Sequence, residues 1–220
     1  QRPKGVPKKH VNSPDSERYH NASLLYGIYQ AKKAIAKLDR VYLVEGQADV
    51  ISMYQAGIEN VVAGSGTALS FAQIHMLHRL TSNITLIYDD DEAGLHAALK
   101  GTDMLLSEGM NLKVLLLPDG EDPDSFARKH TAEELKQYIE QHETDFIQFK
   151  TNLLLKDVTD PIKRTEAINA IVKSISLVTN PILRDTYVQS CVARTGVAEA
   201  TIINTLNRFI REQKEGTHSD

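Results

Sequence analysis

Acidic side chains gather in three groups along the sequence, and each group follows a short apolar run directly or within a few residues. The three groups are Glu45 with Asp49, Asp89 with Asp91, and Asp122 with Asp124. Carboxylates that converge repel one another: a like-charged pair 4 Å apart costs about 1 kcal/mol in water and about 4 kcal/mol at an effective dielectric of 20. A divalent cation relieves that repulsion, and an all-carboxylate set suits Mg²⁺ or Mn²⁺, which also bind phosphates. The groups therefore predict metal-dependent phosphoryl transfer, in which two ions would hold the attacking and leaving oxygens.

Some of these carboxylates also have a purely structural interpretation, which the sequence leaves open. Asp49 falls near the start of a predicted helix, where a carboxylate favours the helix dipole. Asp122 precedes Pro123, which is the pattern of an N-cap followed by proline at the first helical position. Glu45 is harder to explain in this way, because a carboxylate that follows an apolar run needs a partner if it is buried.

The segments that would position these carboxylates alternate between strands and helices. Short apolar runs predict four strands, over residues 41–45, 60–63, 84–89 and 112–118. Helices are predicted between them, over residues 49–55, 70–80 and 93–107. Because nearly continuous apolar strands that alternate with helices form parallel sheets covered on both faces, we expect an α/β fold. Ligands of such sheets lie at the carboxyl ends of the strands, where the acidic groups fall.

The pattern becomes wholly helical from Thr131 onward. Helices are expected over residues 145–156, 162–178, 181–195 and 199–211. A lead-in helix over residues 21–38 precedes the first strand, and residues 1–16 have the Pro, Gly and Ser content of an extended arm. We therefore divide the chain into a basic arm with its lead-in helix (1–40), an α/β domain (41–130) and an all-helical subdomain (131–220).

Composition excludes several classes of protein. The chain has 220 residues, an ordinary globular composition and a net charge of −4, which argues against wholesale disorder and against a simple nucleic-acid coat. No apolar run approaches the roughly 18 residues of a membrane span. The one cysteine, Cys191, excludes an internal disulfide and a zinc site built from several cysteines. We expect an excised piece of a cytoplasmic protein, with no membrane association.

Charge is distributed unevenly along the chain. Residues 1–40 carry nine basic and three acidic residues, whereas residues 41–130 carry five basic and 13 acidic residues. This asymmetry suggests one region that holds a polyanion and another that holds cations, although a solvated tail and a solvated acidic face would give the same counts.

Three smaller features each allow two interpretations. The segment Gly64-Ser65-Gly66-Thr67 offers amides and hydroxyls that would face a phosphate, or it forms an ordinary strand-to-helix turn. His75 and His78 share one helix, where packing or solvation is favoured over metal binding. The segment around Gly196 has the pattern of a helix-turn-helix turn, but a plain helical hairpin is favoured.

Four motifs occur in a fixed order along the chain. They are E-G-x-x-D-V at 45–50, G-T at 66–67, Y-D-x-D-x-A-G at 88–94 and L-P-x-G-x-D-P-D at 117–124. In this order they resemble the TOPRIM domain of bacterial DnaG-type DNA primases. Asn12-Ser13-Pro14 followed by Leu25-Tyr26-Gly27 is similar to the primase segment that leads into that domain. The resemblance covers about residues 7–130, and such primases carry a helical subdomain where this chain becomes helical.

The resemblance implies a DNA-dependent RNA polymerase that makes short RNA primers for replication on single-stranded DNA. By resemblance, Glu45, Asp89 and Asp91 would be the catalytic metal ligands, with Asp49, Asp122 and Asp124 completing the acidic centre. Lys9, Gly66 and Thr67 would bind nucleotide or nucleic acid.

The same resemblance implies cofactors and partners. We expect Mg²⁺ or Mn²⁺ and no zinc in this stretch of chain, with NTPs as substrates and an RNA–DNA hybrid as product. A replicative helicase would bind through a C-terminal module outside this chain, and a cysteine-based zinc module would precede it.

Two further classes of function remain open. A metal-dependent TOPRIM nuclease would share every carboxylate but cut the strand, and a non-catalytic module would bind nucleic acid or a replication partner without turnover. The N-S-P and L-Y-G segments favour the primase.

Overall fold

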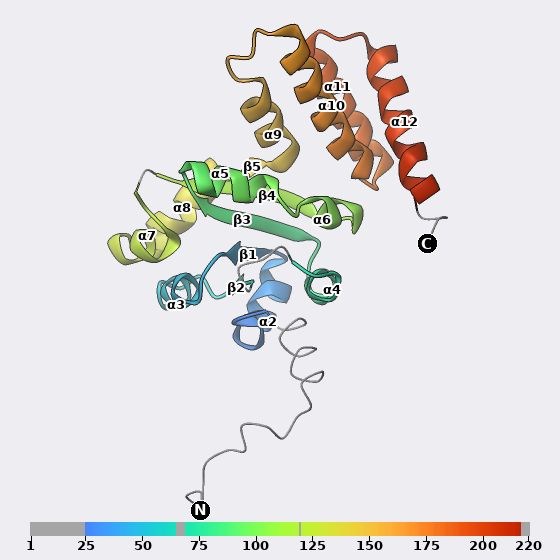
Figure 1. Ribbon diagram of the computed structural model, residues 1–220. Helices are drawn as coiled ribbons and strands as arrows, with labels where there is room; N and C mark the ends of the chain where they lie inside the picture. Colours follow the sequence, from blue (N-terminus) through green and yellow to red (C-terminus); the bar gives the residue numbers. More distant parts are fainter. Residues whose placement is uncertain (1–24, 65–68, 119, 217–220) are drawn as a thin grey trace, which may run out of the picture.

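A five-stranded sheet forms the centre of the molecule in the computed structural model, which describes residues 25–64, 69–118 and 120–216 (Figure 1). The strands are β1 (Val41–Val44), β2 (Val61–Ala63), β3 (Asn83–Asp89), β4 (Asn111–Leu117) and β5 (Thr144–Asp145). Their order across the sheet is β2-β1-β3-β4-β5, and the first four are parallel. The predicted α/β fold with four parallel strands is therefore confirmed.

The fifth strand was not predicted. β5 runs antiparallel to β4, with Thr144 opposite Val114 and Asp145 opposite Lys113. It has only two residues and both are polar, so it lacks the apolar run on which strand prediction relies.

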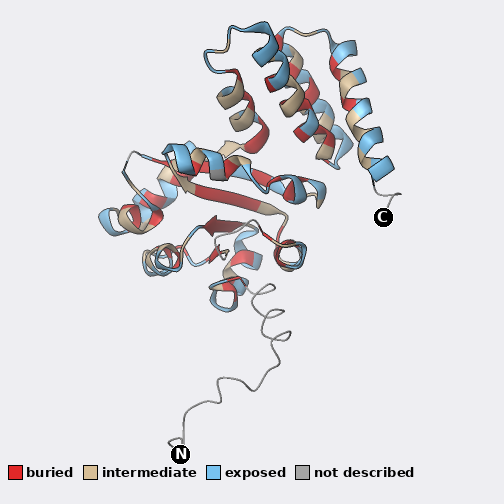
Figure 2. Ribbon diagram, in the orientation of Figure 1, coloured by how far each residue is buried: buried red, intermediate tan, exposed pale blue. Residues whose placement is uncertain are grey.

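Alternate strand residues point to opposite faces of the sheet, and both faces are buried. Leu43 and Leu86 belong to one apolar core, whereas their neighbours Val44 and Ile87 belong to a second core on the other face. Figure 2 shows the strands buried and the outer faces of the helices exposed. This burial on both sides explains why the strands have nearly continuous apolar sequences.

Within the described residues, the α/β part has seven helices. They are α2 (Ile28–Leu38), α3 (Gln47–Gln55), α4 (Phe71–His78), α5 (Glu92–Leu99), α6 (Asp103–Ser107), α7 (Pro123–Lys129) and α8 (Ala132–His142). The core on the Leu43 face receives residues from α2, α4 and α6, and the core on the Val44 face receives residues from α3, α7 and α8.

One predicted helix is divided in two. The predicted helix over 93–107 breaks at Gly101, whose φ is 67°, so that α5 and α6 are separate. A glycine adopts this left-handed conformation without the steric penalty that other residues incur.

The remaining helices form the predicted all-helical part. They are α9 (Phe146–Leu155), α10 (Pro161–Leu177), α11 (Pro181–Thr195) and α12 (Glu199–Gly216). Their buried residues continue the core of the Leu43 face. In the described residues no helix combines the length and apolar character needed to cross a membrane.

The packing of the elements just after residue 130 bears on the predicted boundary between the two parts, which stays a prediction. Leu135 and Ile139 of α8 lie in the core of the Val44 face, and β5 pairs with β4. We propose that the division falls after Asp145, because the elements before it belong to the sheet layer and those after it are helical only.

Candidate active site

The carboxyl ends of β1 and β3 form the topological switch point of the sheet. From β1 the chain passes to β2 on one side and then returns to β3 on the other side. Leu43 pairs with Leu86, so Glu45, which follows β1, lies close to the end of β3 at Asp89. Open α/β sheets bind their ligands outside the strand ends at such a point, because the helices leave in opposite directions and open a crevice.

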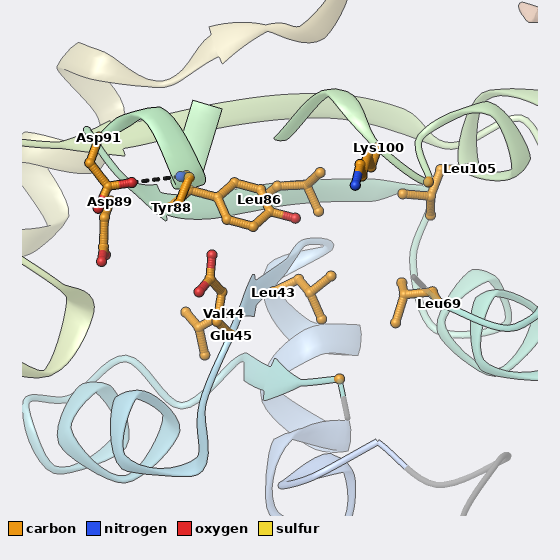
Figure 3. Close-up of a pocket in the computed structure, with 14 residues that line it drawn as sticks. Leu43, Val44, Glu45, Leu69, Leu86, Tyr88, Asp89, Asp91, Lys100 and Leu105 are labelled. Atoms are coloured by element: carbon orange, nitrogen blue, oxygen red, sulfur yellow. Dashed lines mark hydrogen bonds between the residues drawn. The ribbon is translucent and has the colours of Figure 1, made fainter. Parts of the chain in front are cut away.

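A pocket of about 580 Å³ occupies this position (Figure 3). Glu45, Asp89 and Asp91 line its acidic end, and leucines such as Leu86 line its wall. Lys100 lies at the other end, just before the break between α5 and α6. The lining of the pocket therefore combines three carboxylates, an apolar wall and the side chain of Lys100.

The carboxylates at the acidic end act on one another electrostatically. Burial raises the pKa of Glu45, and the charges of Asp89, Asp49 and Asp91 raise it further. Burial also raises the pKa of Asp89, with Asp122, Asp91 and Asp49 adding to the effect. Among the described residues no lysine, arginine or histidine forms a salt bridge with Glu45 or Asp89. Within that part of the chain, no salt bridge therefore offsets the repulsion between these two carboxylates.

Asp49 ties two helices together at the edge of this site. One oxygen accepts a hydrogen bond from Gly46 N at 3.2 Å, and the other accepts one from Asp124 N at 3.0 Å. The first bond holds the start of α3 and the second holds α7 against α3. Burial still raises the pKa of Asp49, and the nearby Asp122 and Asp124 raise it too, although the two amides oppose this.

Asp122 and Asp124 have structural partners of their own. Asp122 caps α7 by accepting a hydrogen bond from Ser125 N at 2.6 Å. Asp124 accepts hydrogen bonds from the Ser52 hydroxyl and from Arg128 Nη2, the latter at 2.8 Å. The N-cap interpretation of Asp122 is confirmed.

Gly94 has a steric role beside the two aspartates. Asp91 Oδ1 accepts a hydrogen bond from Gly94 N at 2.6 Å, drawn in Figure 3. A Cβ atom at position 94 would lie 2.0 Å from the carbonyl oxygen of Asp89. Only glycine fits here, because α5 begins in direct contact with the backbone that carries Asp89.

The predicted residues thus separate into three sets. Glu45, Asp89 and Asp91 meet in the pocket, whereas Asp49, Asp122 and Asp124 lie beside it on α3 and at the start of α7. Lys9, Gly66 and Thr67 lie outside the described residues.

Two titratable residues of the pocket, Tyr88 and Lys100, were not predicted as site residues. Tyr88 lies in the Y-D-x-D motif, and burial together with the charge of Glu45 raises its pKa to about 12. Lys100 carried no sequence signal, because the break at Gly101 that brings it to the pocket was not predicted.

The carboxylates predicted as metal ligands are not gathered tightly in this conformation. Within the described ranges no three His, Cys, Asp or Glu side chains lie close enough to hold a metal ion among them. Mg²⁺ is nevertheless commonly held by one or two carboxylates together with waters and substrate phosphates, rather than by a complete protein cage.

Comparison with known proteins identifies the family. A family model described as Toprim-like matches residues 42–127, and one described as the DnaB-helicase binding domain of primase matches residues 147–200. A DNA primase of Staphylococcus epidermidis is 36% identical over 206 residues, which cover 93% of this chain and 34% of that protein. The chain belongs to the family of bacterial DnaG-type primases.

Solved primase structures share the fold. A DNA primase domain from Pseudomonas aeruginosa matches with a TM-score of 0.77 and 29% identity, over 92% of this chain and 65% of that one. A DnaG primase catalytic domain bound to single-stranded DNA matches with a TM-score of 0.71 and 33% identity, over 85% of this chain and 62% of that one.

The chain spans about a third of the length of the curated DNA primases that it matches. The Toprim-like match contains all six predicted carboxylates. The helicase-binding match lies inside the helical part, at residues 147–200, and this corrects the expectation that such a module lies outside this chain.

Proposed function

We propose that this chain is part of the catalytic core of a DnaG-type primase, which joins NTPs into a short RNA primer on single-stranded DNA. One observation supports this site above others. Glu45 and Asp89 lie together at the switch point, in a pocket, and neither forms a salt bridge among the described residues. The primase relatives supply the reaction, and this group of carboxylates is the place where it would occur.

The donor set fits a divalent cation such as Mg²⁺ or Mn²⁺. Glu45, Asp89 and Asp91 offer only carboxylate oxygens, which hard cations prefer. Each of Glu45 and Asp89 has a raised pKa partly because of its acidic neighbours, and a bound cation would remove that penalty. When bound, the metal would activate the primer 3′-hydroxyl and stabilise the charge that develops on the phosphates.

The six carboxylates would then have two different roles. We assign metal binding to Glu45, Asp89 and Asp91. We assign positioning to Asp49, Asp122 and Asp124, because each of them accepts hydrogen bonds that fix α3 or α7. No side-chain nucleophile is required, since the work of the site is to orient the reactants and to stabilise charge.

The proposed substrates are a single-stranded DNA template and NTPs, and the product is an RNA–DNA hybrid. The primase catalytic domain solved with single-stranded DNA supports the template. The helicase-binding match over residues 147–200 supports a replicative helicase as protein partner, with the contact on α9–α11. Co-purification of a replicative helicase with this chain would support that contact, and its absence would place the contact elsewhere.

The test is an incubation of the chain with labelled single-stranded DNA, NTPs and Mg²⁺ or Mn²⁺, in which both new RNA and template breakage are measured. Glu45→Gln removes a proposed metal ligand. Glu59→Gln is the matched control, because Glu59 is exposed and precedes β2 at the amino edge of the sheet.

Short RNA that Glu45→Gln abolishes and Glu59→Gln preserves is the expected result. Template cutting that depends on Glu45, without RNA, would instead establish the nuclease. The absence of both products would contradict catalysis by this chain.

A further inference from the structure

The exposed side of α2 is basic and aromatic, and no role has been assigned to it above. Ile28, Ala31 and Ile35 are buried and attach the helix to the sheet. Tyr29, Lys32, Lys33 and Lys37 are exposed. Lys32 and Lys33 follow Tyr29 by three and four residues, and Lys37 follows Lys33 by four. We call these four residues the α2 basic face. Side chains with this spacing lie on the same side of a helix.

The charge of this face is uncompensated within the described residues. α2 contains no acidic residue, and its three lysines form no salt bridge in the part of the chain that the structure describes. The chain as a whole has a net charge of −4, whereas α2 carries three lysines and no acidic residue. A face of this kind complements a polyanion.

Tyr29 adds a flat apolar surface to the lysines. Tyr29 is 73% exposed, whereas tyrosines are on average intermediate in burial. The ammonium of Lys32 lies 5.3 Å from the centre of the ring, in cation–π contact. Lysines that hold phosphates beside a ring that stacks on a base are the combination by which proteins bind single-stranded nucleic acid.

The α2 basic face begins at the same edge of the sheet as the carboxylates. Tyr26, just before α2, exchanges backbone hydrogen bonds of 3.0 and 3.1 Å with Ala63 at the end of β2. Ala63 is paired with Val44, which directly precedes Glu45. Figure 1 places α2 beside β1 and β2, at the end of the sheet opposite α9–α12. The first residues of the α2 basic face therefore lie nearest the switch point, and the later residues lie farther from it along the outer side of the sheet.

We propose that the α2 basic face binds single-stranded nucleic acid, with phosphates on Lys32, Lys33 and Lys37 and a base stacked on Tyr29. The identity of the bound strand rests on the proposed function. The strand would be the single-stranded DNA template, in the part that extends away from the carboxylates. Duplex DNA, anionic membranes and acidic proteins are the alternatives that the test separates.

The test measures the affinity of the 220-residue chain for a fluorescent single-stranded oligonucleotide as a function of salt concentration. The triple variant K32Q/K33Q/K37Q should lower the slope of log K against log salt by about 2, because each phosphate contact on a single strand contributes about 0.7. At 0.1 M salt this corresponds to about a 100-fold loss of affinity. The control K136Q/K156Q/K163Q removes the same charge from exposed lysines on α8, at the end of α9 and on α10, and should leave the slope nearly unchanged.

Tyr29 is tested separately from the charges. Tyr29→Ala should weaken binding by roughly 5- to 150-fold without a change in the salt slope, because stacking releases no counterions. Tyr29→Phe keeps the ring and should restore most of the affinity.

Several outcomes would overturn the proposal. They are absence of binding by the unmodified chain, equal losses in the two triple variants, and equal affinity for duplex DNA or for anionic phosphatidylserine vesicles. An unmodified chain that binds the oligonucleotide but makes no primer in the activity assay would refute the proposed function and leave this inference standing.

Discussion

The contact between Gly94 and the backbone of Asp89 gives a sharp test of how the site is built. In Gly94→Ala the new Cβ would lie 2.0 Å from the carbonyl oxygen of Asp89 and 3.2 Å from Asp91 Oδ1. Real Cβ atoms do not approach heavy atoms closer than 3.0 Å, so either the start of α5 or the end of β3 must move by about 1 Å. That movement changes the position of Asp89 relative to Asp91, which are two of the three proposed metal ligands.

Gly94→Ala should have a small effect on the stability of the fold and a large effect on the rate of primer synthesis. Overpacking of this kind destabilises a fold by about 1–3 kcal/mol, which the chain should survive. A displacement of about 1 Å at a catalytic group costs about 100-fold in rate, because the reaction depends on the position of the groups. We therefore expect Gly94→Ala to fold and to lose at least about 100-fold of primer synthesis.

The assay compares primer synthesis and urea unfolding for Gly94→Ala and for a matched glycine variant. Gly216→Ala is the control, because a Cβ there meets nothing within 4 Å. Primer synthesis within a factor of a few of the unmodified chain would refute the reasoning, because it would show that the position of Asp89 and Asp91 does not limit the reaction.

Three further predictions concern other parts of the molecule. Glu143→Gln should lower the free energy of unfolding by about 2 kcal/mol. The reason is that Glu143, whose side chain is 8% exposed, accepts two hydrogen bonds from Arg40, of 2.7 and 2.8 Å. Urea unfolding measures this loss, and an equal loss in the variant Glu140→Gln, at an exposed position, would contradict the prediction. Mg²⁺ at ten times its Kd should stabilise the chain by about 1.4 kcal/mol, because it would relieve the repulsion around Glu45; a thermal shift as large in Glu45→Gln would place the ion elsewhere. Cys191 is 3% exposed and burial raises the pKa of its thiol, so a thiol reagent should modify it only on unfolding, and rapid labelling of the native chain would show that α11 opens.

The sheet and the acidic edge were predictable because their signals are local. Each of the four parallel strands is an apolar run followed within a few residues by glycine or aspartate, and a strand buried on both faces needs little else. Once the strands are parallel, Glu45 and Asp89 must emerge at the same edge. Their meeting therefore follows from the order of elements, without knowledge of side-chain geometry.

The features that were missed depend on contacts between distant residues. β5 exists because β4 offers it a free edge, and its sequence of Thr144 and Asp145 gives no sign of this. The hydrogen bond from Asp124 N to Asp49 joins residues 75 positions apart, so spacing along the chain could not distinguish a metal ligand from a residue that holds α7.

The lysines and tyrosine of α2 illustrate the same limit. The sequence predicts a helix over residues 21–38 with Ile28, Ala31 and Ile35 at helical spacing. Only the structure shows that these three pack on the sheet and leave the lysines exposed. Composition therefore revealed an excess of basic residues in the first 40 positions without locating the surface that they form.

The central claim is that the carboxylates at the ends of β1 and β3 form the active site for primer synthesis. Substitution of two adjacent aspartates tests this claim most directly. Asp89 lines the pocket, whereas its neighbour Asp90 is exposed and does not. The measurement is the yield of RNA on single-stranded DNA by Asp89→Asn and Asp90→Asn at equal concentrations of folded protein. The account predicts that Asp89→Asn loses at least about 100-fold and that Asp90→Asn retains most of the activity. Equal activity in the two variants, or a greater loss in Asp90→Asn, would contradict it.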